Sequence, residues 1–252
     1  MHRVRIAPGA QPGDLITLPK PEAHYVARVL RLRAGDEVNA FDGVSHEYHV
    51  QLTTVSSATV QGQVVRVLTR PAVSLAPLIL GQAIPKGAKM DLIVEKCSEL
   101  GLTTLVPLYT ERTVVRNSPQ RIDEKLARWQ RVAEAAARQC GRCVLLELRR
   151  PMTLSDFCAH YVTAPVKLVC WEKESQRGLR HIFGQWYGQH PVVVLIGPEG
   201  GWSDQEIDVA QSHGFLTTHL GSLTLRTETA AIAITSIIRY HLSELEPLGK
   251  AP

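Results

Sequence analysis

Residues 192–207, VVVLIGPEGGWSDQEI, restrict the possible folds of this chain more than any other stretch. The five residues 192–196 are apolar and mostly β-branched, which favours a strand that is buried on both faces. The loop that follows contains Gly197, Gly200 and Gly201, which let a backbone approach a ligand closely and adopt any positive φ that this requires. The stretch therefore predicts a strand, a glycine-rich loop and a helix within a parallel α/β sheet.

The same residues indicate where the helix begins and which ligand loops are excluded. Ser203 followed by Glu206 is a capping-box pattern, so the helix should begin near Asp204. A phosphate-binding P-loop needs Gly-Lys-Ser/Thr at the helix start, which GPEGGWSD lacks. A dinucleotide loop needs G-x-G-x-x-G, which is also absent, and Glu199 would repel a pyrophosphate. An α/β-hydrolase elbow needs a serine between its glycines. By itself, the loop is also compatible with a turn that binds no ligand.

From about residue 78 onward, apolar runs alternate with amphipathic segments. Strands are expected at LILGQAI, TTLVPLY, VKLVCW, VVVLIG and within HGFLTTHLG, and helices at KMDLIVEKCSELG, QRIDEKLARWQRVAEAAARQCG and TAAIAITSIIRYHL. Gly101 is placed to end the first of these helices, and Trp129 falls on the buried face of the second. Such alternation favours a mainly parallel sheet with helices on both faces.

The first 70 residues differ, because they predict a small β-rich module. EVNAFDGVSHEYHVQL places Asp42-Gly43 between two alternating runs, which indicates a hairpin with a tight turn. ATVQGQVVRVL is typical of a further strand, and HYVARVLRL of a short helix or turn that carries basic residues. TRPAVSLAP, residues 69–77, then breaks the pattern with two prolines. We therefore expect two domains, residues 1–72 and residues 73–252.

The distribution of charge points to a polyanionic partner. The net charge of +4 is mild, but residues 1–35 hold six Lys or Arg against two acids, and residues 111–150 hold ten against five. Two basic clusters in separate parts of the chain favour nucleic acid as the partner. A solvated basic surface without a partner would have the same composition.

Composition also indicates the compartment. The start, MHRVRIAPGA, lacks the apolar core of a signal peptide, and no uninterrupted apolar run approaches the roughly 20 residues of a membrane span. The five cysteines are irregularly spaced, which suits reduced thiols better than a disulfide framework. We therefore expect a cytoplasmic protein with no membrane partner.

Two patterns have the spacing of metal or redox sites without predicting one. Cys140 and Cys143 form Cys-x-x-Cys, yet no second pair stands at zinc spacing and the motif ends a basic helix. His46 and His49 lie in the expected hairpin, where residues three apart face opposite sides of the strand. We expect no bound metal.

Two strings in the last quarter of the chain carry a family resemblance. LIGPEGGWSDQEI followed by LGSLTLRTETAA resembles the signature of the RsmE family of the SPOUT superfamily, the 16S rRNA (uracil-N3)-methyltransferases. HYVARVLRLRAGDEVNAFDG resembles the N-terminal module of that family, KGAKMDLIVEKCSELGLTTLVPLYTERTVV the start of its catalytic domain, and RWQRVAEAAARQCGR its central basic helix. The sequence departs from the family at Thr224-Leu225-Arg226, where Ile-Leu-Arg is frequent, and at Trp202, where an aromatic or Phe-like residue is common.

The resemblance implies an α/β fold with a C-terminal SPOUT methyltransferase domain, in which a mainly parallel sheet is accompanied by a deep trefoil knot. Such a knot is a rare exception to the rule that chains do not thread their own loops. A small PUA-like β-barrel domain would precede it. The implied cofactor is S-adenosylmethionine, which has no phosphate and so accounts for the missing lysine. The implied cofactor-binding residues are Leu195, Ile196, Gly197, Pro198, Gly200, Gly201, Leu220, Gly221, Leu225 and Arg226.

The implied reaction transfers a methyl group to N3 of one uridine in 16S rRNA, which must be unpaired and must lose its N3 proton. Arg226 is the candidate cation for the negative charge that develops on the uracil oxygens. Glu228 or Glu199 would orient this arginine or accept the proton, and both assignments stay open.

The implied partners are 16S rRNA in the assembled small ribosomal subunit and a second copy of the chain in a homodimer. Cations that bind RNA would hold phosphates rather than read bases. The RNA-binding candidates are Arg3, Arg5, Arg28, Arg31, Lys86, Lys89, Arg112, Arg138 and Arg142.

Two other functions are compatible with the sequence. One is a SPOUT methyltransferase that acts on a ribose 2′-OH, although such relatives use a final loop that differs from LRTETA. The other is a non-catalytic ribosome-assembly factor with the same fold, which need not bind the cofactor.

Overall fold

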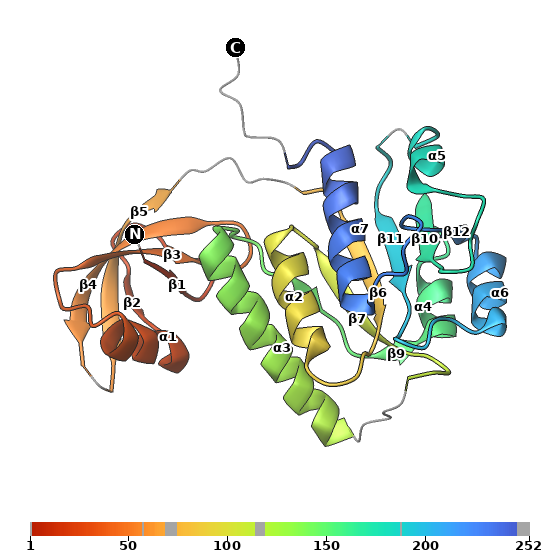
Figure 1. Cartoon of the computed structure of the whole chain (residues 1–252). Helices are drawn as coiled ribbons and strands as arrows, with labels where there is room; N and C mark the ends of the chain where they lie inside the picture. Colours follow the sequence, from red (N-terminus) through yellow and green to blue (C-terminus); the bar gives the residue numbers. More distant parts are fainter. Residues whose placement is uncertain (1, 57, 69–74, 114–118, 187, 246–252) are drawn as a thin grey trace, which may run out of the picture. The chain divides into compact units, whose positions relative to one another are not determined.

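The computed structural model of the protein describes residues 2–56, 58–68, 75–113, 119–186 and 188–245 (Figure 1). The chain divides into two compact units. Unit 1 consists of Met1–Ser74 and Glu134–Leu145, and unit 2 of Leu75–Ala133 and Leu146–Pro252. Helix α3, Pro119–Cys140, therefore contributes residues to both units. The expected domain boundary between residues 72 and 73 lies outside the described residues.

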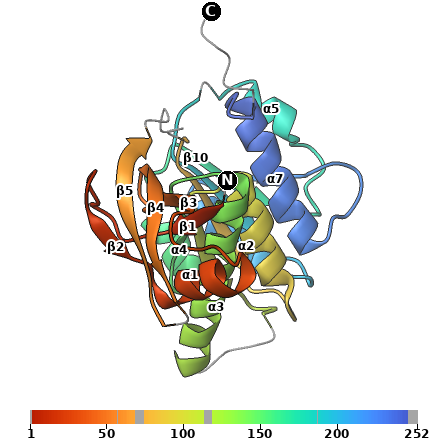
Figure 2. The same ribbon diagram turned by 90° about the vertical axis from the view of Figure 1, so that its left-hand side faces the viewer.

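Unit 1 is built on a five-stranded sheet with the order β1-β3-β4-β5-β2, and Figure 2 shows these strands side by side. β1 and β3 pair in parallel, and the other neighbours are antiparallel. Alternate strand residues such as Val38, Ala40 and Val50 are fully buried and form the core of the unit. The strands are β1 (Arg3–Arg5), β2 (Leu15–Thr17), β3 (Glu37–Phe41), β4 (Glu47–Val55) and β5 (Val60–Leu68).

A short helix follows β2, as HYVARVLRL predicted. It consists of α1, Lys20–His24, and one π-helical segment, Tyr25–Val29. Val26 is fully buried and Ala23 nearly so, and both belong to the same core as the strands. The segment therefore covers the sheet with its apolar side, which leaves Arg28 exposed.

The predicted hairpin between β3 and β4 is confirmed, but its turn is longer than expected. The connection spans residues 42–46 instead of the tight turn expected at Asp42-Gly43. The Asp42 side chain, in a residue that is 2% exposed, accepts hydrogen bonds through Oδ1 from the N–H groups of Val44, Ser45 and His46 at 2.9, 2.9 and 3.0 Å. A buried carboxylate thus organises the longer turn through charge-assisted hydrogen bonds.

Unit 2 contains a parallel sheet with the order β12-β10-β11-β6-β7-β8, and β9 also pairs with β7. Its strands are β6 (Leu78–Ala83), β7 (Thr104–Tyr109), β8 (Glu147–Leu148), β9 (Met152–Thr153), β10 (Val166–Cys170), β11 (Val192–Ile196) and β12 (Leu216–Thr218). Its other helices are α2 (Lys89–Glu99), α4 (Leu154–His160), α5 (Leu179–Phe183), α6 (Asp204–Ser212) and α7 (Thr227–His241).

Helices cover both faces of this sheet, which confirms the predicted architecture. α2 and α7 pack on one face, and α4 and α6 on the other (Figure 1). Successive side chains of β11 point to opposite faces of the sheet and so contribute to both cores. Val194 and Ile196 face the α2/α7 core, whereas Val193 and Leu195 face the α4/α6 core. Trp129 of α3 is 3% exposed and belongs to the α2/α7 core, as predicted.

The predicted strands and helices beyond residue 78 are found, and Gly101 follows α2 with a φ of 89°, as a helix-ending glycine should. Four short elements, β8, β9, α4 and α5, were not predicted. Each has seven residues or fewer, which is too short to show a clear hydrophobic period. Among the described helices, none combines the length and apolar character that crossing a membrane requires.

Replacing Asp42 by alanine should destabilise the protein, because three backbone N–H groups of the turn would lose their acceptor. We expect the free energy of unfolding to fall by about 2 kcal/mol, the size typical of hydrogen bonds to a charged group. Chemical denaturation followed by circular dichroism measures the change. Asp36→Ala is the matched control, because Asp36 is exposed and its side chain accepts from one N–H, that of Arg33. A loss as large in the control would contradict the role given to Asp42.

The stability of the fold should also depend on pH through the Asp42 carboxylate. Burial raises the pKa of Asp42, but the hydrogen bonds from Ser45, Val44 and His46 outweigh burial and lower the pKa below the usual 3.8. Its contribution to stability is therefore complete above pH 3.8 and is lost as the pH falls through the lower pKa of the folded state. Denaturation at a series of pH values measures the free energy of unfolding. Below about pH 4 this free energy should fall more steeply for the wild type than for Asp42→Asn.

Candidate functional site

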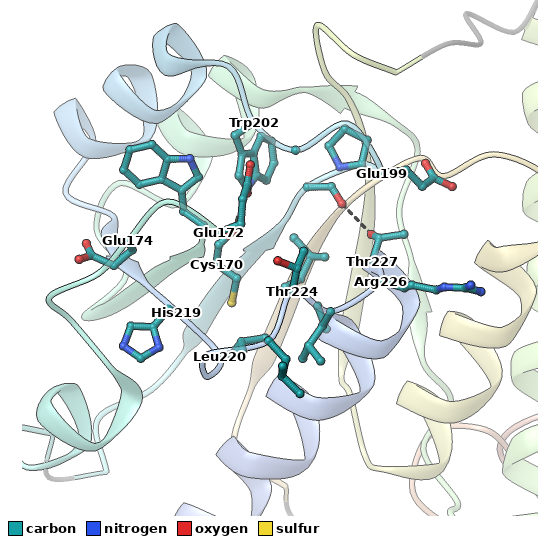
Figure 3. A pocket seen from close by; sticks show the side chains of 18 of the residues that line it. Cys170, Glu172, Glu174, Glu199, Trp202, His219, Leu220, Thr224, Arg226 and Thr227 are labelled. Atoms are coloured by element: carbon teal, nitrogen blue, oxygen red, sulfur yellow. Dashed lines mark hydrogen bonds between the residues drawn. The ribbon is translucent and has the colours of Figure 1, made fainter.

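A cavity of about 520 Å³ lies in unit 2 at the carboxyl ends of β10, β11 and β12 (Figure 3). Parallel sheets bind ligands at this edge, and the volume suits a small molecule. Three segments line the cavity, which we call the β10 loop (residues 170–174), the β11 loop (residues 196–202) and the β12 loop (residues 219–226). Lys89 of α2 and the first residues of α7 complete the wall.

The β11 loop is anchored to the end of β10. Trp202, which is 1% exposed, donates a hydrogen bond from Nε1 to the Cys170 carbonyl at 3.0 Å. Gly197 packs against the Trp202 ring, since a Cβ at this position would lie 3.1 Å from Nε1. Gly201 has a φ of 70°, and a Cβ there would lie 2.3 Å from Oε1 of Glu172. The glycines therefore let the loop backbone form the wall beside two large side chains.

The predicted capping box begins α6 directly after this loop. Ser203 Oγ accepts a hydrogen bond from the Glu206 N–H at 3.3 Å, and Glu206 Oε2 accepts from the Ser203 N–H at 3.0 Å. Glu206 also accepts through Oε1 from the Glu111 N–H at 2.8 Å. These bonds satisfy donors that the first turn of a helix leaves unpaired, and they fix the end of the β11 loop.

The ends of β10 and β12 are tied together by polar contacts beside the cavity. The Arg177 carbonyl accepts hydrogen bonds from the Thr218 hydroxyl and from the His219 N–H, both at 3.1 Å. Glu174 accepts from the Thr217 hydroxyl and from the backbone N–H groups two and three residues further along the chain. The hydrogen bond from Thr217 is the main reason that the pKa of Glu174 falls to about 2. This carboxylate is therefore charged at neutral pH.

Lys89 links the two acids that the sequence proposed for catalysis. Its Nζ lies 2.9 Å from Oε1 of Glu199 and 3.6 Å from Oε2 of Glu228. Glu199 also accepts from the Lys86 N–H at 3.1 Å. Burial raises the pKa of Glu199, but the hydrogen bonds from Lys89 and Lys86 outweigh burial and lower the pKa. The hydrogen bond to Glu199 raises the pKa of Lys89 in turn, so an ion pair stands at the edge of the cavity.

Arg226 is the residue before α7, and its exposed side chain lies at the cavity wall. Its guanidinium makes no hydrogen bond or ion pair with another residue in the described part of the chain. Figure 3 places Arg226 on the same side of the cavity as Glu199, with Cys170 and His219 on the opposite side. An exposed cation in this position is free to bind an anionic ligand.

Nine of the ten predicted cofactor-binding residues line the cavity, and the exception is Leu195. Leu195 is fully buried in the α4/α6 core, where it lies beside Gly81. Successive strand residues point to opposite faces of a sheet, so Ile196 reaches the cavity and the side chain of Leu195 does not.

The β10 loop was missed by the sequence analysis. Cys170, Trp171, Glu172 and Glu174 line the cavity but carry no motif of their own. Their position was the available signal, because they follow a buried strand, VKLVC, that neighbours the strand before the glycine-rich loop. Burial raises the pKa of the Cys170 thiol to about 12, so the thiol is uncharged.

Three of the predicted RNA-binding arginines make ion pairs inside unit 1. Arg3 Nε lies 2.8 Å from Oε1 of Glu47, whose side chain is fully buried. Arg5 pairs with a glutamate of α3, and Arg138 pairs with the buried Glu22. These guanidinium groups neutralise buried or half-buried carboxylates, which leaves less of their charge for a phosphate.

The other predicted cations differ in their surroundings. Arg112 is exposed and donates to the Gly200 carbonyl, so it supports the β11 loop. Lys89 belongs to the cavity wall, and Arg142 is half-buried. Exposed side chains are found at Arg28, Arg31 and Lys86.

Within the described ranges, no group of three or more His, Cys, Asp or Glu side chains is arranged to hold a metal ion. Among the described residues, neither Cys140 nor Cys143 forms a disulfide, and Cys143 Sγ accepts a hydrogen bond from the Arg3 guanidinium at 3.7 Å. His46 and His49 each lie within 3.3 Å of a carboxylate in the hairpin. Each histidine therefore has a carboxylate partner within its own hairpin.

Comparison with protein families gives two matches in the order found here. The family of the RNA methyltransferase domain matches residues 73–239, and that of the RNA methyltransferase PUA domain matches residues 18–65. A ribosomal RNA small subunit methyltransferase E from Synechocystis is 34% identical over 231 residues, which cover 91% of this chain and 74% of the relative. Its counterpart from Bacillus subtilis is 26% identical and covers 87% of each chain.

Solved structures agree with these matches. A methyltransferase from Legionella pneumophila in complex with S-adenosylmethionine superposes with a TM-score of 0.89 at 34% identity, over 95% of this chain and 97% of the other. A ribosomal RNA small subunit methyltransferase E from Neisseria gonorrhoeae, also bound to S-adenosylmethionine, gives 0.84 at 27% identity over the same shares. The predicted α/β methyltransferase domain and PUA-like first domain are therefore confirmed. The chain belongs to the RsmE family of RNA methyltransferases.

Proposed function

We propose that this protein transfers a methyl group from S-adenosylmethionine to N3 of a specific uridine in the 16S rRNA of the small ribosomal subunit. The observation that carries the proposal is the cavity, because the two loops with the RsmE resemblance form its wall. Relatives that share the fold over 95% of the chain were solved with S-adenosylmethionine bound.

The residues around the cavity suit this cofactor. The volume of about 520 Å³ is that of a small-molecule site, and glycines leave much of the wall to backbone groups. Glu172 and Glu174 place negative charge at the cavity, which favours a ligand that carries a positive sulfonium. When bound, S-adenosylmethionine supplies an electrophilic methyl group.

The residues opposite Cys170 and His219 would act on the RNA base. Arg226 would stabilise the negative charge on the uracil oxygens as the N3 proton leaves. Lys89 brings Glu199 and Glu228 to one corner of the site, so this corner contains both acids proposed as the proton acceptor. Most of the rate enhancement would come from positioning, since methyl transfer requires nucleophile, carbon and sulfur in line.

The family resemblance also suggests the oligomeric state of the chain, the topology of its C-terminal domain and the form of its RNA substrate. We infer that the chain acts in the cytoplasm as a homodimer, with a deep trefoil knot in its C-terminal domain and the assembled small subunit as its substrate. The PUA-like unit 1, with Arg28 and Arg31 exposed, would bind the phosphate backbone of the RNA.

Incubation of the protein with labelled S-adenosylmethionine and small subunits from a strain that lacks the enzyme tests the proposed reaction. We expect label on N3 of a single uridine in 16S rRNA, located by mass spectrometry of nuclease fragments. Label on a ribose 2′-oxygen would identify a different SPOUT reaction. Failure both to bind cofactor and to transfer methyl would favour a non-catalytic assembly factor. Bare 16S rRNA as a parallel substrate shows whether assembly is required.

Arg226→Ala should bind S-adenosylmethionine nearly normally but lose methylation, because the developing charge on uracil would have no fixed cation. We expect turnover to fall by about 100-fold or more, the size typical of removing one charge-stabilising group. Calorimetry measures cofactor binding, and methyl incorporation measures turnover. Arg180→Ala, which removes an exposed arginine of α5, is the control and should retain both. Undiminished turnover of Arg226→Ala would remove this residue from the mechanism.

Binding of RNA should weaken with salt in proportion to the number of phosphate contacts. The double variant Arg28→Ala/Arg31→Ala should reduce the slope of log Kd against log salt by about two, since each contact contributes roughly one. Arg3→Ala should instead lower the melting temperature, because the buried Glu47 would lose its ion pair with Arg3. Filter binding at several salt concentrations and thermal unfolding separate these effects. An unchanged slope in the double variant would contradict phosphate contacts at Arg28 and Arg31.

A further inference from the structure

A buried chain of hydrogen bonds joins the two glycine-containing loops of the cavity. Gln82, near the end of β6, donates from Nε2 to Thr227 Oγ1 at 2.9 Å and to the Ala83 carbonyl at 2.9 Å. Thr227 Oγ1 donates in turn to the Gly197 carbonyl at 2.6 Å, the contact drawn as a dashed line in Figure 3. Three elements distant in the sequence are therefore connected through one hydroxyl.

The direction of each bond follows from the chemistry of that hydroxyl. Thr227 has one proton to donate, and the short contact with the Gly197 carbonyl uses it, because a carbonyl oxygen can only accept. The hydroxyl must therefore accept from Gln82, which requires the NH₂ group of the amide to face it. Both N–H bonds of that NH₂ group then have acceptors, Thr227 and Ala83.

The surroundings make this connection strong. Gln82 is 0% exposed, and Thr227 is 6% exposed. Gln82 follows Leu80 on the face of β6 that packs against α7, beside a mostly apolar core. Its Oε1 is buried without a hydrogen-bond partner in the described part of the chain. Because Gln82 is fully buried, water does not replace a hydrogen bond that its amide loses, so the amide is held where both of its N–H groups have acceptors.

The position of the connection matters because of what it joins. Gly197 belongs to the β11 loop and directly follows the last residue of β11, and Thr227 directly follows the β12 loop. The spacing between these loops sets the width of the cavity in which the proposed cofactor would bind. Gln82 itself does not line that cavity.

We propose that Gln82 is a positioning residue for S-adenosylmethionine, which sets the spacing of the two loops through Thr227 without touching the cofactor. The inference rests on the proposed function, because it assigns the cavity to that cofactor. It adds that a residue outside the cavity contributes to the affinity for S-adenosylmethionine.

Gln82→Met keeps the length of the side chain and cannot donate, so it should raise the Kd for S-adenosylmethionine by about tenfold, the effect of one lost hydrogen bond. The Kd for S-adenosylhomocysteine should rise in parallel, because the effect acts through loop spacing and not through charge. The turnover number at saturating cofactor should stay within about twofold of wild type, so that KM changes and kcat does not. Calorimetry and steady-state kinetics measure these quantities.

Variants of Thr227 test the route of the effect. Thr227→Val removes the hydroxyl and should weaken binding by about tenfold, whereas Thr227→Ser keeps the hydroxyl and should bind as wild type does. The double variant Gln82→Met/Thr227→Val should be no weaker than either single variant, because both break one connection. Thr235→Val is the matched control: this buried threonine of α7 donates to Ala231 within its own helix, and its loss should leave cofactor affinity unchanged.

Wild-type affinity in a folded Gln82→Met variant would overturn the proposal, and so would effects that multiply in the double variant. Thermal unfolding without cofactor shows whether each variant is folded. If Gln82→Met does not unfold cooperatively, the comparison of Thr227→Val with Thr227→Ser tests the proposal in its place. Equal affinities of these two variants for S-adenosylmethionine would overturn it. Failure of the wild type itself to bind S-adenosylmethionine would instead refute the proposed function.

Discussion

The parallel direction of the paired strands in unit 2 determines where a ligand can bind. Because the carboxyl ends of β10, β11 and β12 meet at one edge, three loops that are distant in the sequence form a single wall. The apolar cores on both faces keep the strands in place, so a few polar contacts suffice to set the loops. The bonds from Trp202 to the Cys170 carbonyl and from Thr227 to the Gly197 carbonyl are of this kind.

The charges around the cavity are separated into two regions. Glu174 is fixed as a carboxylate by the Thr217 hydroxyl and by backbone N–H groups, on the side of the β10 loop. Glu199 and Arg226 belong to the other side, where Glu199 and Glu228 both pair with Lys89, so Arg226 supplies the cation that has no ion-pair partner in the described part of the chain. One site can therefore attract a cationic group on one side and an anionic base on the other, as a sulfonium cofactor and a deprotonated uracil would require.

The sequence predicted those features that leave a local pattern. The buried strand before Gly197, the capping box at Ser203 and the buried face of α3 at Trp129 each have a short-range signature. Contacts between distant residues have none. Gln82 lies 145 residues from Thr227, and Glu174 lies 43 residues from Thr217, so neither pairing could be foreseen. Arg3 was expected to bind phosphate because its charge is visible in the sequence, whereas its partner Glu47 is found only after folding.

The Cys170 thiol lies in the wall of the cavity, so its charge state affects the chemistry of the site. The nucleophile in cysteine chemistry is the thiolate and not the thiol, so the charge state of a cysteine that lines a site for a methyl donor matters. Burial keeps Cys170 protonated, with a pKa of about 12, so its reactive form is scarce at neutral pH. The wall of the cavity thus contains a sulfur atom that is neutral and polarisable and not a charged nucleophile.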